Sequence, residues 1–308
     1  MLKKVSVALV IATYNWPEAL KLVLESVCNQ IVLPDEVIIA DDGSERSTRD
    51  LIDSYRDKLK VTLKYFWHKD DGFQKTIILN QAIAGTQCDY IIQVDGDIVL
   101  NKYFIRDHLR AAERGYYVRG SRVMLDENRS QSELGFEKLR RITAFSTGIT
   151  NRINALRIPA MAALFTKKSS RSDNVSGCNW AFWLEDFVNV NGYNNEITGW
   201  GHEDIELAAR FINIGLLQKK IKGQAICYHL FHDYADRHKE SLNYSIYEHT
   251  LNQCLRFCLK GYKSFQEDYR YQNHLDYFPT VGSERGGMHL LKSHISTERK
   301  SVPESHLH

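Results

Sequence analysis

Residues 90–97 read Tyr-Ile-Ile-Gln-Val-Asp-Gly-Asp, a short apolar run that ends in the carboxylates of Asp95 and Asp97. A run of this length and composition predicts a β-strand that is buried on both faces. Two carboxylates at a strand end suit a hard divalent cation, because Mg²⁺ and Mn²⁺ favour oxygen ligands and bridge to phosphates. The alternative is an Asx turn that only closes the strand.

The same pattern occurs earlier in the chain. The apolar runs 5–12 and 37–40 also end in polar side chains, which are Thr13, Tyr14, Asn15, Asp41 and Asp42. Segments with helical spacing of apolar residues, such as residues 75–84, separate the runs. Strands that alternate with helices predict an α/β fold with a mostly parallel sheet flanked by helices. Ligands of such sheets bind beyond the carboxyl ends of the strands, so we expect these polar groups to share one crevice.

The role of Asp42 has two interpretations. An aspartate at this place accepts hydrogen bonds from a nucleobase or from ribose hydroxyls, and Gly43 allows close backbone approach. Alternatively, Asp42 or Ser44 caps the helix that follows.

Composition sets outer limits on the class of protein. The chain has 308 residues, of which 43% are hydrophobic and 25% charged, and its net charge is +2. These values predict a folded protein of one large domain or two closely fused ones, and they argue against a dedicated nucleic-acid binder. The longest apolar run is far shorter than the roughly 18 residues of a membrane span. With six scattered cysteines and no CxxC motif, we expect a cytoplasmic protein.

The order and spacing of these motifs resemble those of a known family. Residues 10–15, 39–44 and 93–97 together resemble the GT-A nucleotide-sugar glycosyltransferases of family 2, over about residues 5–232. The resemblance implies a Rossmann-like GT-A fold in which Asp95 faces the ribose or the donor sugar. It also implies a set of residues that hold the nucleotide, namely Thr13, Tyr14, Asn15, Asp42 and Lys75. Many relatives carry Arg-Asn where this chain has Leu79-Asn80, and Lys75 would supply the missing positive charge.

The second half of the chain narrows the resemblance. Residues 177–183, 191–194 and 199–207, with Gly-Trp-Gly-His-Glu-Asp at 199–204, resemble the acceptor region of chondroitin-polymerase-type and β1,4-galactosyltransferase-type enzymes. The resemblance implies that Asp204 is the general base, that Glu203 binds the acceptor hydroxyl and that Trp200 stacks on a sugar. A carboxylate with an ordinary pKa of about 4 is ionised at neutral pH and ready to accept that proton. The alternative is a helix start with Trp200 in the core, and both can hold.

A histidine completes the metal site that the resemblance implies. His229 follows a strand-like run and would join Asp97 in binding Mn²⁺ or Mg²⁺, with His232 as the second choice. An imidazole ligand favours Mn²⁺ over Mg²⁺.

The chain divides by pattern into three parts. We expect a donor-binding half at 1–125, an acceptor-binding half at 126–235, and a helical extension with a loose tail at 236–308. Residues 126–174 are irregular and basic, and residues 242–259 read as an amphipathic helix. Both segments are consistent with docking on an anionic membrane that carries a lipid-linked acceptor. A flexible acceptor lid and an ordinary packed helix explain them equally well.

The leading hypothesis is an inverting, metal-dependent glycosyltransferase that moves a sugar from a nucleotide sugar, UDP-linked, to a glycan or lipid-linked saccharide in surface polysaccharide biosynthesis. One alternative is a sugar-nucleotide nucleotidyltransferase, although residues 12–20 lack the glycines and basic residues of a phosphate loop. The other alternative is a non-catalytic glycan-binding protein of the same fold.

Overall fold

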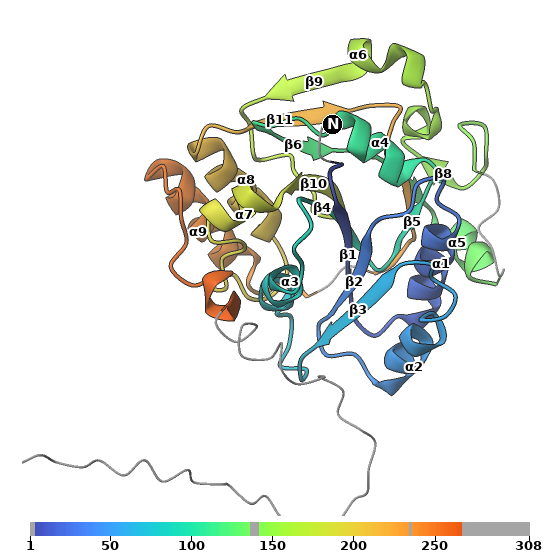
Figure 1. Cartoon of the computed structure of the whole chain (residues 1–308), viewed down its shortest axis with the longest axis horizontal. Coiled ribbons are helices and arrows are strands. Elements are labelled where there is room, and N and C mark those ends of the chain that lie inside the picture. The colour runs from blue at the N-terminus through green and yellow to red at the C-terminus, as the bar shows by residue number, and fades with distance from the viewer. Residues whose placement is uncertain (1–3, 136–141, 234–235, 267–308) are drawn as a thin grey trace, which may run out of the picture. The chain divides into compact units, whose positions relative to one another are not determined.

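A mixed sheet of eight strands, in the order β3-β2-β1-β4-β10-β6-β11-β9, forms the centre of the computed structural model (Figure 1). The strands at one end of this order are parallel to one another, and they are β1 (Val7–Thr13), β2 (Glu36–Asp41), β3 (Thr62–Trp67) and β4 (Tyr90–Asp95). The structure describes residues 4–135, 142–233 and 236–266, which lie in one compact unit. The predicted α/β fold is therefore confirmed.

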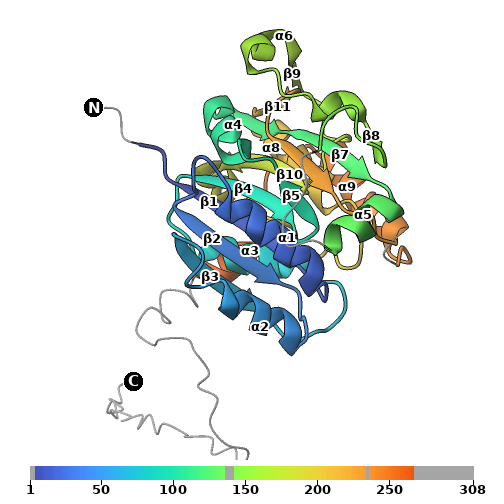
Figure 2. The same cartoon turned by 90° about the vertical axis from the view of Figure 1, so that its right-hand side faces the viewer.

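Helices cover both faces of this parallel part. The helix α1 (Pro17–Cys28) and the shorter α2 (Arg46–Ser54) lie on one side, and α3 (Lys75–Ala84) lies on the other (Figures 1 and 2). Alternate residues of β1 therefore enter different cores: Val7, Leu9 and Ile11 pack with α1, whereas Ala8, Val10 and Ala12 pack with α3. A strand buried on both faces needs no polar alternation, which explains the continuous apolar run in the sequence.

Beyond β4 the strands of the large sheet are no longer all parallel. The strand β10 (Asn179–Trp183) runs antiparallel between β4 and β6 (Tyr116–Arg119). Next come β11 (Leu217–Ile221), parallel to β6, and the edge strand β9 (Thr166–Ser169). Because β10 is antiparallel, it begins where β4 ends, and the residues just before it reach the edge that carries Asp95.

Three further helices lie on the same side as α3 in Figure 1. They are α7 (Leu184–Asn189), α8 (Glu203–Asn213) and α9 (Glu240–Asn252). Their packing places the first turn of α8 next to the carboxyl end of β4.

A smaller sheet adjoins the large one. Its strands, in spatial order, are β5 (Ile98–Leu100), β12 (Ile226–His229), β7 (Ser121–Leu125) and β8 (Ile149–Thr150). In the chain, the helix α4 (Phe104–Ala111) follows β5, and the helix α5 (Glu127–Leu134) follows β7. Since β5 starts directly after Asp97, and His229 pairs with Ile98, the two sheets meet beside the acidic turn.

The basic segment 126–174 contains more secondary structure than its sequence predicts. Besides α5, β8 and β9 it holds short helical turns, which are η1 (Arg152–Ala155), η2 (Pro159–Met161) and α6 (Ala162–Phe165). These elements are too short to show periodicity, and the two strands form only by pairing with β7 and β11. Residues 136–141 lie outside the described part of the chain.

The predicted amphipathic helix at 242–259 is wrong in length and in its buried face. The helix α9 ends at Asn252, and its buried side chains are Asn243, Tyr247 and Thr250, whereas Leu242 is 60% exposed. Hydrogen bonds from polar side chains orient the helix: Thr250 donates to Glu206 Oε1 at 2.9 Å, and Asn243 donates to a backbone carbonyl before α8 at 3.2 Å. Within residues 4–135, 142–233 and 236–266, no helix is long and apolar enough to cross a bilayer. The predicted tail lies outside the described residues.

Candidate active site

The carboxyl ends of β1, β2 and β4 bring polar residues from distant parts of the sequence to one edge of the sheet. In the strand register Thr13 lies beside Asp41, and Ala12 lies beside Asp95. The Asp42 N–H donates to the Thr13 carbonyl at 3.0 Å, which fixes the turn after β2 against β1. Parallel strands end at the same edge, so these polar residues share one edge of the sheet, and a crevice between them stays a prediction.

Tyr14 and Asn15 follow β1 at this edge of the sheet. The Tyr14 hydroxyl donates to Asp70 Oδ2 at 2.9 Å, and this hydrogen bond raises the pKa of the phenol, while the ring stays exposed. Asn15 has a φ of 44°, and its side-chain oxygen accepts from the Glu45 N–H at 2.8 Å. Asn15 therefore ties the turn after β1 to the start of α2, and the exposed Tyr14 ring is free to stack on a ligand.

Asp42 connects the turn after β2 to the start of α3. Its carboxylate accepts from the Gln74 N–H at 2.9 Å and lies 2.7 Å from His68 Nε2. The interpretation of Asp42 or Ser44 as the cap of the next helix is wrong, because α2 has no side-chain cap. Sequence reasoning missed His68, although it follows the third strand as the other polar clusters follow theirs.

Lys75, the first residue of α3, lies among three carboxylates that we call the acid cluster: Asp95, Glu203 and Asp204. Its Nζ is 2.7 Å from Asp95 Oδ1 and 3.8 Å from Glu203 Oε1. Burial alone would lower the Lys75 pKa, but the charges of Asp95, Asp204 and Glu203 hold the pKa well above its ordinary value. The lysine is therefore a fixed cation that joins the end of β4 to the start of α8.

Asp204, the third member of the acid cluster, lies in the first turn of α8. Burial, followed by the charge of Glu203, raises its pKa to about 7, while Lys75 opposes the shift. The Gly177 N–H donates to Asp204 Oδ2 at 2.6 Å. The Tyr193 hydroxyl lies 3.4 Å from Asp204 Oδ1, but it donates its proton to Gln93 Oε1 at 2.9 Å. The Gly177 hydrogen bond thus orients the carboxylate, whose pKa is close to the pH at which a biological general base works.

Gly177 is needed for this contact. A Cβ placed on Gly177 would lie 2.1 Å from Asp204 Oδ1, closer than any real contact of such atoms. Only glycine lets the segment before β10 approach the carboxylate so closely.

Asp97, His229 and His232 converge at the junction of the two sheets. Asp97 Oδ2 is 3.2 Å from His229 Nε2 and 3.1 Å from His232 Nε2, and one ligand atom of each residue lies within 4.8 Å of the others. The sequence left the two histidines as alternatives, and the structure brings both to Asp97. They arrive from different places, one at the end of β12 and the other in the loop that follows.

This group fits a divalent cation. Among the described residues, Asp97 Oδ1 and His229 Nδ1 are buried atoms without a hydrogen-bond partner. The hydrogen bond to Asp97 raises the His232 pKa to about 9, so His232 must lose this proton before it can bind a metal ion. One carboxylate and two imidazoles form a mixed oxygen and nitrogen donor set that suits Mn²⁺.

Trp200 lies before α8 and is only half-buried. The Arg237 guanidinium stacks 4.4 Å from the centre of its ring, and Asn243 donates to its carbonyl at 3.4 Å. The interpretation of Trp200 as a core residue therefore does not hold, in contrast to Trp180, which is fully buried. A sugar-stacking role for Trp200 stays a prediction.

A large, mostly parallel sheet flanked by helices, joined to an antiparallel strand, is the arrangement of the GT-A class of glycosyltransferase folds. The crystal structure of S. aureus TarS superposes on 90% of this chain and 45% of that one, with a TM-score of 0.53 and 14% identity. The chain belongs to glycosyl transferase family 2, whose profile matches residues 8–171. A second profile, the N-terminal domain of galactosyltransferase, matches residues 157–233.

Curated relatives agree with this assignment. Chondroitin synthase of Escherichia coli is 25% identical over 237 residues, covering 72% of this chain and 34% of that protein. Hyaluronan synthase of Pasteurella multocida is 24% identical, covering 73% of this chain and 24% of its own length. Validoxylamine A glucosyltransferase of Streptomyces hygroscopicus subsp. limoneus is 28% identical, covering 66% of this chain and 47% of its own. The chain thus spans between about a quarter and a half of these relatives.

Proposed function

We propose that the protein is an inverting, metal-dependent glycosyltransferase that moves a sugar from a UDP-sugar to a saccharide or lipid-linked saccharide in surface polysaccharide biosynthesis. The observation that carries the proposal is the position of Lys75. One buried ammonium group contacts Asp95 on the donor side and Glu203 on the acceptor side, with Asp204 beside it. Donor and acceptor machinery therefore form one site rather than two.

The proposed mechanism starts from Asp204. Its carboxylate takes the proton from the acceptor hydroxyl as that oxygen attacks the anomeric carbon, and the nucleoside diphosphate leaves from the opposite face. A pKa of about 7 suits this step, because near neutral pH a substantial share of the group is ionised and the carboxylate is more basic than an ordinary one. Glu203, in the same helical turn, accepts a hydrogen bond from the acceptor and orients the attacking hydroxyl.

The donor binds at the carboxyl ends of β1, β2 and β4. In the proposal Thr13, Tyr14, Asn15 and Asp42 contact the nucleoside, and Asp95 faces the ribose or the sugar. The residues Asp97, His229 and His232 would hold a divalent cation, which supplies positive charge to the departing diphosphate. Lys75 adds a second positive charge nearby, although its ion pairs with Asp95 and Glu203 make it a positioning group as well.

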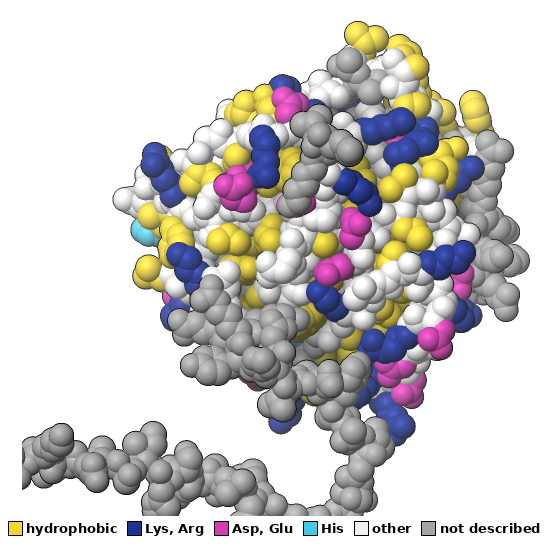
Figure 3. All heavy atoms as spheres, in the orientation of Figure 1, with side chains coloured by type: hydrophobic (Ala, Val, Ile, Leu, Met, Phe, Trp, Pro, Cys, Tyr) yellow, Lys and Arg dark blue, Asp and Glu magenta, His cyan; other side chains and the backbone are white. Residues whose placement is uncertain are grey.

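A peripheral membrane contact belongs to the same proposal. The segment around α6 projects from the edge of the large sheet, where yellow side chains form the upper tip in Figure 3. Leu164 is 76% exposed there, next to the exposed lysines of β9, which are Lys167 and Lys168. Exposed apolar groups beside basic ones suit an anionic bilayer. We expect the protein to sediment with anionic liposomes and to be released as the salt concentration rises, whereas salt-independent behaviour would contradict electrostatic docking.

The test of the function is product analysis. With Mn²⁺ present, a panel of UDP- and GDP-sugars is assayed for hydrolysis and transfer, and we expect release of nucleoside diphosphate. Release of pyrophosphate would instead identify a nucleotidyltransferase, and no turnover with any donor would favour a glycan-binding protein.

The base assignment is tested in the same assay with Asp204→Asn. We expect transfer to fall by about 10²–10⁴-fold, the usual contribution of a general base, while nucleotide binding persists. Asp186→Asn is a matched control, because burial also raises the pKa of Asp186, in α7. Near-normal transfer by Asp204→Asn would overturn the assignment.

A further inference from the structure

A basic cavity of about 300 Å³ opens between β6, β7, β11 and η1. Its charged lining consists of Arg119, Arg122, Lys220 and Lys222, and among the described residues that line it none is acidic. Four cations around one cavity repel each other, so the arrangement is unfavourable unless an anion neutralises it.

The strand register places cations side by side on this face of the sheet. Lys220 lies opposite Arg119 of β6 on one side and opposite Lys167 of β9 on the other. Like charges that face each other across strands are destabilising. Burial, and then the charges of Arg119, Lys222 and Lys167, lower the Lys220 pKa accordingly.

On the opposite face of the same strands, a carboxylate neutralises the lysines that face each other. One residue earlier in β11, Lys219 lies opposite Lys168, and these two side chains share the carboxylate of Glu113 at 2.8 and 3.6 Å. In the part of the chain that the structure describes, no carboxylate takes this place beside Lys220. The cavity face therefore keeps a positive charge that the neighbouring face does not.

The cavity adjoins the proposed general base. Arg122 donates to Ser176 Oγ and to Cys178 Sγ, both at 3.1 Å. Between these residues, the Gly177 N–H donates to Asp204 at 2.6 Å. The segment 176–178 thus has the base on one side and the basic cavity on the other.

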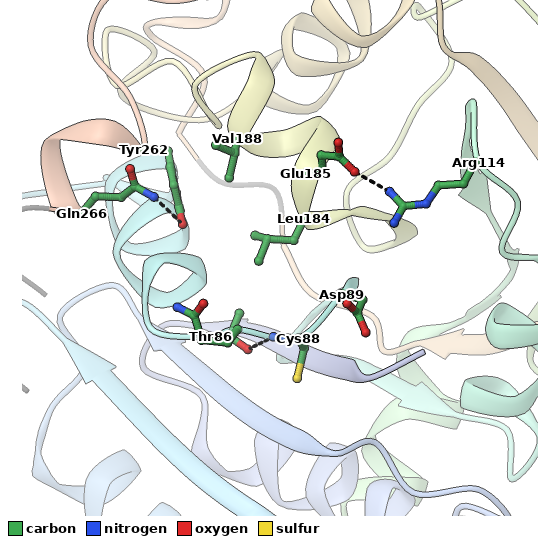
Figure 4. A pocket seen from close by; sticks show the side chains of 10 residues that line it. Thr86, Cys88, Asp89, Arg114, Leu184, Glu185, Val188, Tyr262 and Gln266 are labelled. Carbon is green, nitrogen blue, oxygen red and sulfur yellow. Dashed lines mark hydrogen bonds and ion pairs between the residues drawn. The ribbon is translucent and has the colours of Figure 1, made fainter. Parts of the chain in front are cut away.

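A second cavity, of about 360 Å³, differs from the basic cavity in its position relative to Asp204 and in the pairing of its arginine (Figure 4). It lies at the amino end of β4, near Asp89, at the opposite edge of the sheet from Asp204. Its arginine, Arg114, is already paired with Glu185 at 2.8 Å. It therefore offers no free charge near the chemistry.

We propose that the cavity lined by Arg119, Arg122, Lys220 and Lys222 binds an oxyanion carried by the acceptor, either the carboxylate of an acidic sugar or a phosphate group. The inference rests on the proposed function, since it names the class of acceptor for that site. Arginine forks bind carboxylate and phosphate oxygens in pairs, and lysines add point charge. An acceptor anchored in this way would present a neighbouring hydroxyl to Asp204 across the segment 176–178.

The first test measures binding alone. Glucuronate and inorganic phosphate are titrated separately into the full chain by calorimetry, without donor. We expect at least one to bind, and Lys220→Met to weaken that binding about tenfold. Lys219→Met is the matched control, since it removes a lysine from the same strand on the neutralised face and leaves binding unchanged. Binding of glucuronate alone identifies an acidic sugar, and binding of phosphate alone identifies a phosphate. Failure of both to bind, or equal losses in the two variants, would overturn the inference.

The second test uses pairs of acceptors that differ only in an anionic group. We expect Lys220→Met to raise KM about tenfold for the anionic acceptor and to leave KM for the neutral one nearly unchanged. Equal KM changes for both acceptors would contradict an oxyanion site. Donor hydrolysis in the same preparations reports on the proposed function separately, so the two failures are distinguishable.

Discussion

The acid cluster and the basic cavity lie on opposite sides of the segment 176–178, and they differ in how the chain treats charge. In the acid cluster three carboxylates surround Lys75, which contacts Asp95 at 2.7 Å. In the basic cavity Lys220 faces Arg119 and Lys167 with no described carboxylate between them. The protein supplies the counter-ion where, in our proposal, catalytic groups must hold their positions. It leaves charge unmatched where, in our proposal, a ligand supplies the opposite sign.

This contrast predicts opposite responses to the removal of a lysine. Removing the partner of a buried charge lowers the free energy of unfolding, because the remaining charge is left uncompensated. Removing one cation from a row of cations that repel each other does not lower it. The following experiments test the contrast, beginning with the largest expected effect.

Lys75→Met would leave the carboxylates of the acid cluster without their cation. We expect the free energy of unfolding to fall by about 3–5 kcal/mol at pH 8, as for other broken buried pairs. Urea denaturation measures this change. Lys64→Met is the control, because the ion pair of Lys64 with Glu36 is more exposed and should contribute about 1 kcal/mol or less. A loss below 1 kcal/mol for Lys75→Met would show that the cluster does not depend on its lysine.

Gly177→Ala would push the Asp204 carboxylate out of position, since the added Cβ would lie 2.1 Å from Oδ1. We expect transfer to fall about 100-fold, because misplacement of a catalytic group by about 1 Å has effects of that size. Nucleotide binding should persist. Gly135→Ala is the control, because a Cβ at Gly135 meets nothing closer than 3.6 Å. Normal transfer by Gly177→Ala would separate the glycine from the positioning of the base.

Asp204→Asn should change how stability depends on pH. The folded-state pKa of Asp204 is about 7, above the unfolded value of about 3.9, so the folded chain binds this proton more tightly. The contribution of the protonated group is complete below the unfolded pKa and is lost as the pH rises through about 7. We therefore expect the Tm of Asp204→Asn, relative to wild type, to rise between pH 5 and pH 8 in EDTA. A difference in Tm that is constant with pH would contradict the raised pKa.

Lys220→Met should have the smallest effect and the opposite sign to Lys75→Met. We expect the free energy of unfolding to stay level or to rise by less than about 1 kcal/mol at low salt, because repulsion with Arg119 and Lys167 is relieved. Salt screens such repulsion, so the gain should disappear at high ionic strength. Lys219→Met, which breaks the ion pair with Glu113, should bring no gain. A clear loss of unfolding free energy for Lys220→Met would mean that other groups already neutralise the repulsion among these cations.

The parallel part of the large sheet, which in our proposal binds the donor, was largely predictable. The strands β1, β2 and β4 are buried on both faces, and such strands appear in the sequence as continuous apolar runs that end in polar residues. The bounds of α3 match the predicted 75–84, because the helix packs one broad apolar surface against the sheet. The topology rule for parallel sheets then placed Asp42 and Asp95 at a common edge.

The other end of the large sheet, which in our proposal binds the acceptor, was less predictable. The strands β6, β9 and β11 are short, and β9 has only exposed or half-buried residues, so no periodic pattern marks it. The segment 126–174 was recognised as basic, but Arg119, Lys220 and Lys222 lie outside it and joined no predicted site. Apolar spacing also misled the prediction for α9, whose contacts are made by Asn243 and Thr250. Hydrogen-bonded polar contacts leave no periodic signal.

The sequence by itself determined the order of strands and helices in the first hundred residues, the family, and the residue types at the ends of those strands, because these depend on local patterns of burial and spacing. Only the tertiary structure decided which charges meet. Lys75 joins Asp95 to Glu203, both histidines approach Asp97, and Lys220 lies opposite Arg119. Each of these encounters is set by the register and crossing of elements that are far apart in the chain, and a Coulomb interaction depends on that distance in space rather than on separation in sequence.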